Sequence, residues 1–225
     1  MQDTINELIA YEDDDVLVVK KPSGLAVETK RIGEEDLVSL LRKYRKAKDG
    51  GKSDFSPAPI NRLDQPVSGL VLFAKTKEAA AFLSKQIQDG NMNKIYEAVV
   101  AGSFEEKEGT LRSFLLKDAK TNTSREVRKG DPDFTKAKEA ILEYKETAPG
   151  RLLIHLKTGR HHQIRVQLSA AGHPILGDLK YGDEESERLS KEKNVKQLML
   201  TATKLTFVHP STKKEMTFEC EGPKE

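Results

Sequence analysis

The sequence of 225 residues contains a single cysteine, Cys220, so no internal disulfide can form. No apolar run approaches the roughly 18 residues that a membrane-spanning helix needs. The first residues, Met1 to Asn6, show no basic region followed by an apolar stretch, so we expect no signal peptide. Together these absences predict a cytoplasmic protein.

Charge of one sign is not in excess either. Lys and Arg number 38 against 36 Asp and Glu, which gives a formal net charge of +2 at pH 7. This is a weak indication of a nucleic-acid partner, and scattered solvated charge explains it equally well. Hydrophobic residues make up 36% and charged residues 33%, which is typical of a soluble protein with a heavily charged surface. The length predicts a single domain over 1–225, with one or two lobes.

The apolar pattern predicts more strands than helices. Strands are expected at 8–11, 16–19, 70–74, 94–101, 110–116, 140–144, 151–157, 197–208 and 215–219. Helices are expected at 35–47, 77–88 and 163–171, a mobile linker at 49–53, an exposed loop or hairpin at 117–134 and a charged insertion at 183–196. Because the strands are mostly sequential, the pattern predicts an α+β fold around a largely antiparallel sheet.

The first segment of chemical interest runs from Asn61 to Leu70. Asp64 stands before a Pro, Ser and Gly turn that leads into a buried strand. Such an aspartate usually bonds its own backbone, and Arg62 beside it usually forms a weak surface pair. Taken alone, this segment is therefore best interpreted as a turn.

The second segment, 156–166, is rich in hydrogen-bond donors where a strand leads into a helix. Arg160 and Arg165 can both bind phosphate or carboxylate in a forked geometry. The neighbours His161 and His162 suggest a metal, but adjacent side chains rarely converge on one ion and Cys220 stands alone. We therefore expect no metal, and in isolation this segment is a polar helix start.

The third segment, 172–182, combines glycines with Pro174 and Asp178. These residues predict a fixed loop whose backbone passes close to a neighbouring group. That neighbour can simply be another part of the protein.

Together, ordered motifs resemble one family. They are Arg-Leu-Asp-x-x-x-Ser-Gly-Leu at 62–70, Lys-x-Tyr-x-Ala at 94–98, Thr-Gly-Arg-x-His-Gln-Ile-Arg-Val at 158–166, and Gly-His-Pro-Ile-x-Gly-Asp-x-x-Tyr-Gly at 172–182. In order and spacing they are similar to the signature of the RluA-type pseudouridine synthases. The resemblance extends from Tyr11 to Pro210, almost the whole chain. Some members carry an extra N-terminal S4 domain, which is not expected here because the signature starts within the first dozen residues.

The resemblance implies a mixed, mostly antiparallel sheet in two lobes, with flanking helices and a central basic cleft. It implies that Asp64 is the catalytic aspartate and that Arg165 pairs with it. Tyr96 would stack on the target base and is a candidate base, while Arg62 would help to hold RNA with its uridine flipped out. The remaining residues expected to contact RNA or substrate are Lys94, Arg160, His162, Gln163 and Ile164.

The chemistry of pseudouridine formation agrees with these roles. The N1–C1′ bond breaks, the uracil rotates and reattaches through C5, and only the C5 proton is lost, so no cofactor is expected. A carboxylate such as Asp64 can attack C1′ directly, or after a proton leaves C2′. Arg165 would keep it ionised in a cleft. An extruded uracil needs a new stacking partner, which suits Tyr96, although a half-buried strand aromatic stays an alternative for that residue.

The implied partner is ribosomal or transfer RNA, bound by a monomer with no obligate protein partner. Departures from the family pattern stand at Asn61, Val67, His161, Gln167 and Thr201, and they put the local hydrogen bonds and the substrate identity in doubt. Two rival functions stay open. One is a non-catalytic RNA-binding protein. The other is a glycosidase or nucleosidase, for which Asp64 and Asp178 would have to lie roughly 5–9 Å apart.

Overall fold

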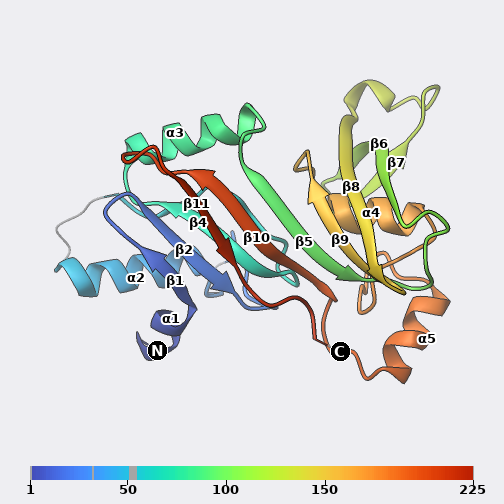
Figure 1. The fold of residues 1–225 in the computed structure, drawn as a ribbon, viewed down its shortest axis with the longest axis horizontal. Coiled ribbons are helices and arrows are strands. Elements are labelled where there is room, and N and C mark those ends of the chain that lie inside the picture. The colour runs from blue at the N-terminus through green and yellow to red at the C-terminus, as the bar shows by residue number, and fades with distance from the viewer. Residues whose placement is uncertain (1, 32, 51–54, 225) are drawn as a thin grey trace. The chain divides into compact units, whose positions relative to one another are not determined.

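A computed structural model describes residues 2–31, 33–50 and 55–224 (Figure 1). The chain folds into two compact units. The first consists of residues 1–92 and 202–220, and the second of residues 93–201 and 221–225. The prediction of an α+β fold with a mostly antiparallel sheet is confirmed, and each unit is described below by itself.

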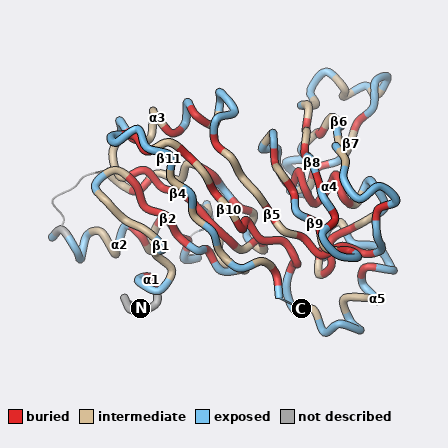
Figure 2. The backbone as a smooth tube through the Cα atoms, viewed as in Figure 1, coloured by how far each residue is buried: buried red, intermediate tan, exposed pale blue. Residues whose placement is uncertain are grey.

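The first unit is built on strands β1 (Ile9–Glu12), β2 (Val16–Lys21), β3 (Ala58–Pro59), β4 (Ser68–Ala74), β10 (Leu200–Val208) and β11 (Glu215–Glu219). Their order is β1-β2-β4-β10, with β3 beside β4 and β11 beside β10. The pairs β1–β2, β2–β4, β3–β4 and β10–β11 are antiparallel. Almost every residue of β2 and β4 is buried (Figure 2). Both strands therefore contain near-continuous apolar runs, as a strand covered on both faces requires.

Helices α1 (Gln2–Leu8), α2 (Leu37–Asp49) and α3 (Lys77–Gln88) belong to the same unit. The sequence predicts the bounds of α3 correctly because Thr76 caps its start by accepting a hydrogen bond from the Ala79 N–H. Helix α2 starts two residues later than predicted, since Asp36 is its N-cap. Helix α1 was not predicted, and residues 51–53 of the predicted linker lie outside the described residues.

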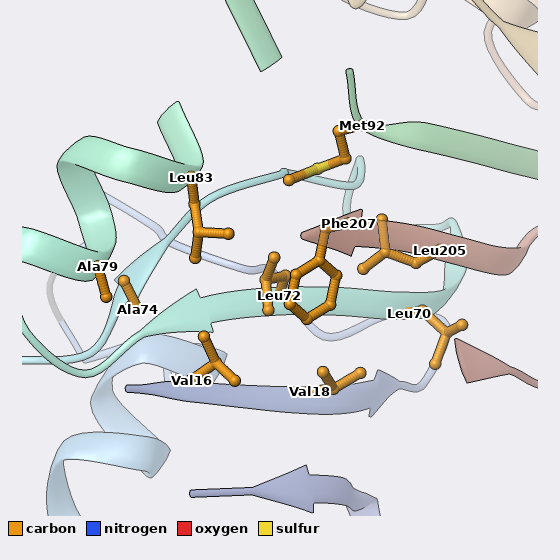
Figure 3. Close-up of a cluster of buried hydrophobic side chains, with 10 residues drawn as sticks. All are labelled: Val16, Val18, Leu70, Leu72, Ala74, Ala79, Leu83, Met92, Leu205 and Phe207. Carbon is orange, nitrogen blue, oxygen red and sulfur yellow. The ribbon is translucent and has the colours of Figure 1, made fainter. Parts of the chain in front are cut away.

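The hydrophobic core of the first unit joins β2, β4, β10 and α3 (Figure 3). Leu72 is fully buried, with Leu83 of α3 and Phe207 of β10 in the same cluster. Each such side chain contributes roughly 1.5–3 kcal/mol on burial. This core fixes β4, the strand into which the Asp64 segment leads.

The second unit has strands β5 (Asn93–Val99), β6 (Glu108–Asp118), β7 (Thr123–Val127), β8 (Lys138–Ala148) and β9 (Arg151–Leu156), in the order β5-β9-β8-β6-β7. All four neighbouring pairs are antiparallel. A tight turn through Pro149 and Gly150 joins β8 to β9. The segment 117–134, predicted as an exposed loop or hairpin, contains the β6–β7 hairpin and leads into the 3-10 helix η1 (Phe134–Lys136). Every predicted strand is present.

Two helices complete this unit, α4 (Gln163–Ala170) and α5 (Glu184–Glu192). Six of the eight residues of α4 are buried, which makes it the central helix of the unit. The predicted charged insertion at 183–196 is largely α5, whose first turn is closed by a capping box between Asp183 and Ser186. The interpretation of 1–225 as one catalytic domain stays a prediction, as does the central cleft.

Candidate active site

Asp64 lies in a tight turn of the first unit. The Val67 N–H donates to the Asp64 carbonyl at 3.0 Å, and β4 begins at the next residue, Ser68. The Asp64 side chain is half-buried. The predicted turn is therefore present, and it places a carboxylate at the start of a rigid strand.

A buried lysine holds this turn. Lys21 is only 1% exposed, and its Nζ donates to the carbonyls of Pro22 at 3.0 Å, Leu25 at 2.7 Å and Gln65 at 3.0 Å. Burial lowers the pKa of the Lys21 ammonium from 10.5 to about 8, while the negative charge of Asp64 opposes that shift. The turn that carries Asp64 is thus tied to an internal cation.

Backbone contacts strengthen the same tie. The Gly24 N–H donates to the Gln65 carbonyl at 2.9 Å, and the Gln65 side chain donates back to the Gly24 carbonyl at 3.0 Å. The Ser23 hydroxyl donates to the Pro66 carbonyl at 2.8 Å. The segment Lys-Pro-Ser-Gly at 21–24 therefore supports the Asp64 segment.

Asn61 and Gly69 fix the two sides of the turn. The buried Asn61 side chain donates to the Leu70 carbonyl at 3.1 Å and accepts from the Leu72 N–H at 2.8 Å. A Cβ on Gly69 would lie 2.3 Å from the Ala202 carbonyl oxygen, and its φ is +118°. The departure at Asn61 is thus accommodated by two hydrogen bonds to β4, and only glycine fits at position 69.

Arg62 has the opposite character. Its side chain is 73% exposed, and Nη1 lies 4.0 Å from a carboxylate oxygen of Glu28, which is also exposed. Such a pair contributes little to stability. The Arg62 guanidinium, two residues before Asp64 in the sequence, is therefore exposed to solvent.

In the second unit, Tyr96 and Lys94 lie on β5. Tyr96 is 5% exposed and is paired with Ile154 of β9, so it is more deeply buried than the half-buried aromatic considered from the sequence. Burial lowers the pKa of the Lys94 ammonium. Contacts of either side chain with RNA stay predictions.

The start of α4 is tightly bonded within the protein. Gln163 accepts from the Thr158 hydroxyl at 2.8 Å and the Arg160 N–H at 3.0 Å, and it donates to the Ile141 carbonyl at 3.1 Å and to Gln167 at 3.0 Å. Gln163 is 3% exposed and Ile164 is 5% exposed. These interior positions do not favour the predicted RNA contacts of Gln163 and Ile164. Arg160 is exposed, although its Nε donates to the Glu139 carbonyl at 2.7 Å.

The departures in and before α4 also have partners inside the unit. Gln167 is 1% exposed and donates to the carbonyls of Leu111 and Ala140, both at 3.2 Å. His161 bonds the Ser124 hydroxyl through Nδ1 at 2.9 Å. Its ring stacks on His162, with 3.7 Å between the centroids. Gln167 and His161, which both depart from the family pattern, therefore form hydrogen bonds of their own within the unit.

Arg165 forms a two-point ion pair with Asp178. Its Nε donates to Oδ2 and its Nη2 to Oδ1, each at 2.7 Å, and both side chains are almost fully buried. The sequence predicted a fixed loop around Asp178 but not the pairing of Asp178 with Arg165. The motif Gly-Asp-x-x-Tyr-Gly was the available signal. The pairing of Arg165 with Asp64 stays a prediction.

His162 is buried at the start of α4. Burial, followed by the positive charge of Arg165, lowers the pKa of its imidazole from 6.5 to about 4, so the ring is neutral at physiological pH. Among the described residues, no three His, Cys, Asp or Glu side chains come together as a metal would require. Within the same residues, no helix is long and apolar enough to cross a membrane.

Comparison with known proteins assigns the family. The family model described as RNA pseudouridylate synthase matches residues 15–170, more than half of the chain. The protein therefore belongs to the RNA pseudouridylate synthase family, and the predicted class of isomerase is confirmed.

Individual relatives agree. The dual-specificity RNA pseudouridine synthase RluA of Vibrio parahaemolyticus is 35% identical, over 91% of this chain and 78% of its own length. The tRNA pseudouridine synthase C of Haemophilus ducreyi is 30% identical, over 93% of this chain and 88% of its own. The ribosomal large subunit pseudouridine synthase C of Salmonella typhimurium is 35% identical, over 95% of this chain but only 66% of its own.

A solved structure supports the fold. Human RNA pseudouridylate synthase domain containing 4 superposes with a TM-score of 0.77 at 22% identity, covering 99% of this chain and 91% of its own. At this identity the likeness concerns the fold alone.

Proposed function

We propose that this protein isomerises a uridine of ribosomal or transfer RNA to pseudouridine, with Asp64 as the nucleophilic carboxylate. One observation carries the assignment of Asp64. Its turn is held by the buried ammonium of Lys21. Burying a charged group costs free energy, and an ordinary surface turn does not require it. Family membership supplies the reaction.

In the proposed reaction the Asp64 carboxylate attacks C1′ of the target nucleoside, or does so after a proton leaves C2′. The N1–C1′ bond breaks with its electron pair on the uracil, which rotates. C5 then bonds to C1′ as the bond between C1′ and the Asp64 carboxylate breaks, which regenerates the free carboxylate. The C5 proton goes to water, N1 takes a proton from water, and a proton removed from C2′ is returned there. Covalent catalysis of this kind divides one difficult displacement into two easier steps.

The other residues have supporting roles in the proposal. Arg165 keeps Asp64 ionised, and Tyr96 stacks on the flipped uracil and is a candidate base. Arg62 contributes an exposed guanidinium that suits a phosphate or a splayed base. Lys94 and Arg160 add positive charge toward the RNA backbone.

The relatives' names support the substrate class, since one name contains the ribosomal large subunit and another contains tRNA. We propose that this protein acts on one of these, with the uridine flipped out of its stack, as a monomer without an obligate protein partner. A cytoplasmic location belongs to the same proposal, since these RNA classes are its expected substrates.

Tritium release tests the reaction. Cellular RNA labelled at uridine C5 should lose label to water when treated with the protein, because C5 becomes the new glycosidic carbon. Asp64→Asn should fold and bind RNA but release no tritium, whereas Asp14→Asn, an exposed aspartate of the same unit, should behave as wild type. Wild-type protein that releases no label from any cellular RNA pool would refute the proposal. Free uracil with abasic RNA would instead identify the glycosidase.

Two further variants separate the supporting roles. Tyr96→Phe keeps the ring but loses the hydroxyl, so normal turnover would limit Tyr96 to stacking. Arg165→Met should lose turnover far more than RNA affinity. The reverse pattern for Arg165→Met would make it a phosphate contact.

A further inference from the structure

We propose that Asp178 and Tyr181 are positioning residues that hold the guanidinium of Arg165 in one orientation. The inference rests on the proposed function, in which Arg165 supports the nucleophile. It concerns the loop 172–182, whose Asp178 and Tyr181 have no part in the reaction as proposed so far.

The carboxylate of Asp178 is saturated by bonds that fix its direction. Besides the two bonds from Arg165, its Oδ1 accepts the Lys180 N–H at 2.9 Å and the Tyr181 N–H at 3.2 Å. Its side chain is 1% exposed and that of Arg165 is 4% exposed. The loop backbone therefore orients the carboxylate, and the carboxylate orients the arginine.

The charge state of this pair is stable. Burial pushes the pKa of the Asp178 carboxyl upward, but the hydrogen bonds and charge of Arg165, with the two backbone N–H groups, outweigh burial and hold the pKa below its usual range. A two-point pair uses Nε and Nη2 and leaves the third nitrogen, Nη1, outside it. Its planar geometry fixes the direction of Nη1 as well.

Tyr181 supports the guanidinium from its face. The Cζ of Arg165 lies 5.0 Å from the centroid of the Tyr181 ring, within the range of a cation–π contact. The Tyr181 hydroxyl accepts the Ser124 N–H at 2.7 Å and lies 2.7 Å from Nδ1 of His162. The ring is thus anchored at its far end.

Tyr181 and His162 share a further hydrogen bond. A neutral His162 ring with hydrogen on Nε2 can accept the Tyr181 hydroxyl proton at Nδ1, while the same hydroxyl oxygen accepts from the Ser124 N–H. His162 also has a φ of +54°, a left-handed conformation that is strained for a non-glycine residue. The contact with Tyr181 holds this strained residue where α4 starts, one turn before Arg165.

The loop itself is constrained to present Asp178. Gly177 has a φ of +76°, and a Cβ there would lie 2.3 Å from the Gln197 carbonyl oxygen. The Gly177 N–H donates to the Ser190 hydroxyl at 2.9 Å, and the Ser169 hydroxyl donates to the Tyr181 carbonyl at 2.7 Å. Such a fixed loop suits a site in which charge must be oriented before the substrate binds.

The first test compares variants in tritium release under single-turnover conditions. Tyr181→Phe removes only the hydroxyl and should slow the step roughly two- to tenfold. Asp178→Asn should slow it about a hundredfold, since small misplacements of a catalytic group have effects of this size. RNA affinity should change little in both. Asp183→Asn, five residues along and outside this network, is the matched control and should keep the wild-type rate.

A double-mutant cycle separates positioning from a general loss of structure. If Asp178 acts through Arg165, adding Asp178→Asn to Arg165→Met should cause no further loss of rate. Equal fold-losses in both backgrounds would overturn the proposal. Wild-type rates in both Asp178→Asn and Tyr181→Phe would overturn it as well.

A third measurement does not depend on activity. The Nε–H proton of Arg165, observed through its ¹⁵N signal, should exchange slowly with solvent in the RNA-free protein. Exchange should stay slow in Asp183→Asn and become fast in Asp178→Asn. If Asp178→Asn folds poorly, Tyr181→Phe provides the test in its place. In that variant the exchange rate should lie between those of wild type and Asp178→Asn. Slow exchange in all variants would refute the positioning role. A wild type with slow exchange but no tritium release would instead refute the proposed function.

Discussion

The buried ammonium of Lys21 gives the sharpest prediction. Its pKa is about 8 in the folded protein against 10.5 for an ordinary lysine, and this difference corresponds to about 3 kcal/mol. Between these two values the unfolded chain binds more protons than the folded protein. The free energy of unfolding contributed by Lys21 must therefore rise as the pH increases through this window.

The matched perturbation is Lys21→Met, with Lys20→Met, its exposed neighbour on β2, as the control. From about pH 7.5 to about pH 9.5, wild type should gain about 2 kcal/mol relative to Lys21→Met. At the lower pH the two effects of the substitution oppose each other. The carbonyls of Pro22 and Leu25 lose a donor, at about 1–3 kcal/mol each, while the burial of a charge is relieved.

Urea denaturation of both variants across this pH range measures the difference, and Lys20→Met should parallel wild type. A wild-type minus Lys21→Met difference that stays constant with pH would refute the reasoning. A second arm uses Asp64→Asn. Because the charge of Asp64 raises the pKa of Lys21, its removal should shift the wild-type rise to lower pH.

Three further predictions concern the two site segments. Gly69→Ala should destabilise the protein by more than about 2 kcal/mol, measured by urea denaturation, because its Cβ would meet the Ala202 carbonyl oxygen at 2.3 Å; an unchanged midpoint would contradict this. Asn61→Ala should cost about 2–4 kcal/mol, since two backbone groups of β4 lose their partners, and Asn61→Asp should restore less than half of it. Acidification from about pH 7 to about pH 4 should remove on the order of 3 kcal/mol through His162, because the unfolded imidazole takes up a proton first; His162→Asn should lack that component of the acid sensitivity in thermal melts.

Local signals predicted much of the fold. Thr76 and the apolar spacing after it define α3, and Pro149 with Gly150 marks the β8–β9 hairpin. Segment 183–196 was not predicted as a helix because its charged side chains have no apolar period. Its Asp183 cap was the only local cue.

The site was predicted unevenly for a similar reason. Asp64, Tyr96 and Arg165 were chosen from ordered motifs, but motifs do not reveal which groups bond one another. The three carbonyl partners of Lys21 and the Asp178 partner of Arg165 depend on tertiary structure. Gln163 shows that a motif does not reveal burial either, because this polar residue was expected at the RNA and lies in the interior, where its contact with RNA stays a prediction.

Each unit contains an internal arrangement of buried charge next to a residue proposed for catalysis. In the first, Lys21 is bonded to three carbonyls around the Asp64 turn; in the second, Asp178 and Tyr181 hold Arg165. Stability alone does not require such a pair as Arg165–Asp178, since apolar side chains of similar volume are often as favourable as a buried ion pair. The common effect of the two arrangements is to fix polar groups before RNA arrives, so that less reorganisation is required in the transition state. We therefore expect that apolar replacements at Lys21 or at the Arg165–Asp178 pair reduce turnover more than they reduce stability.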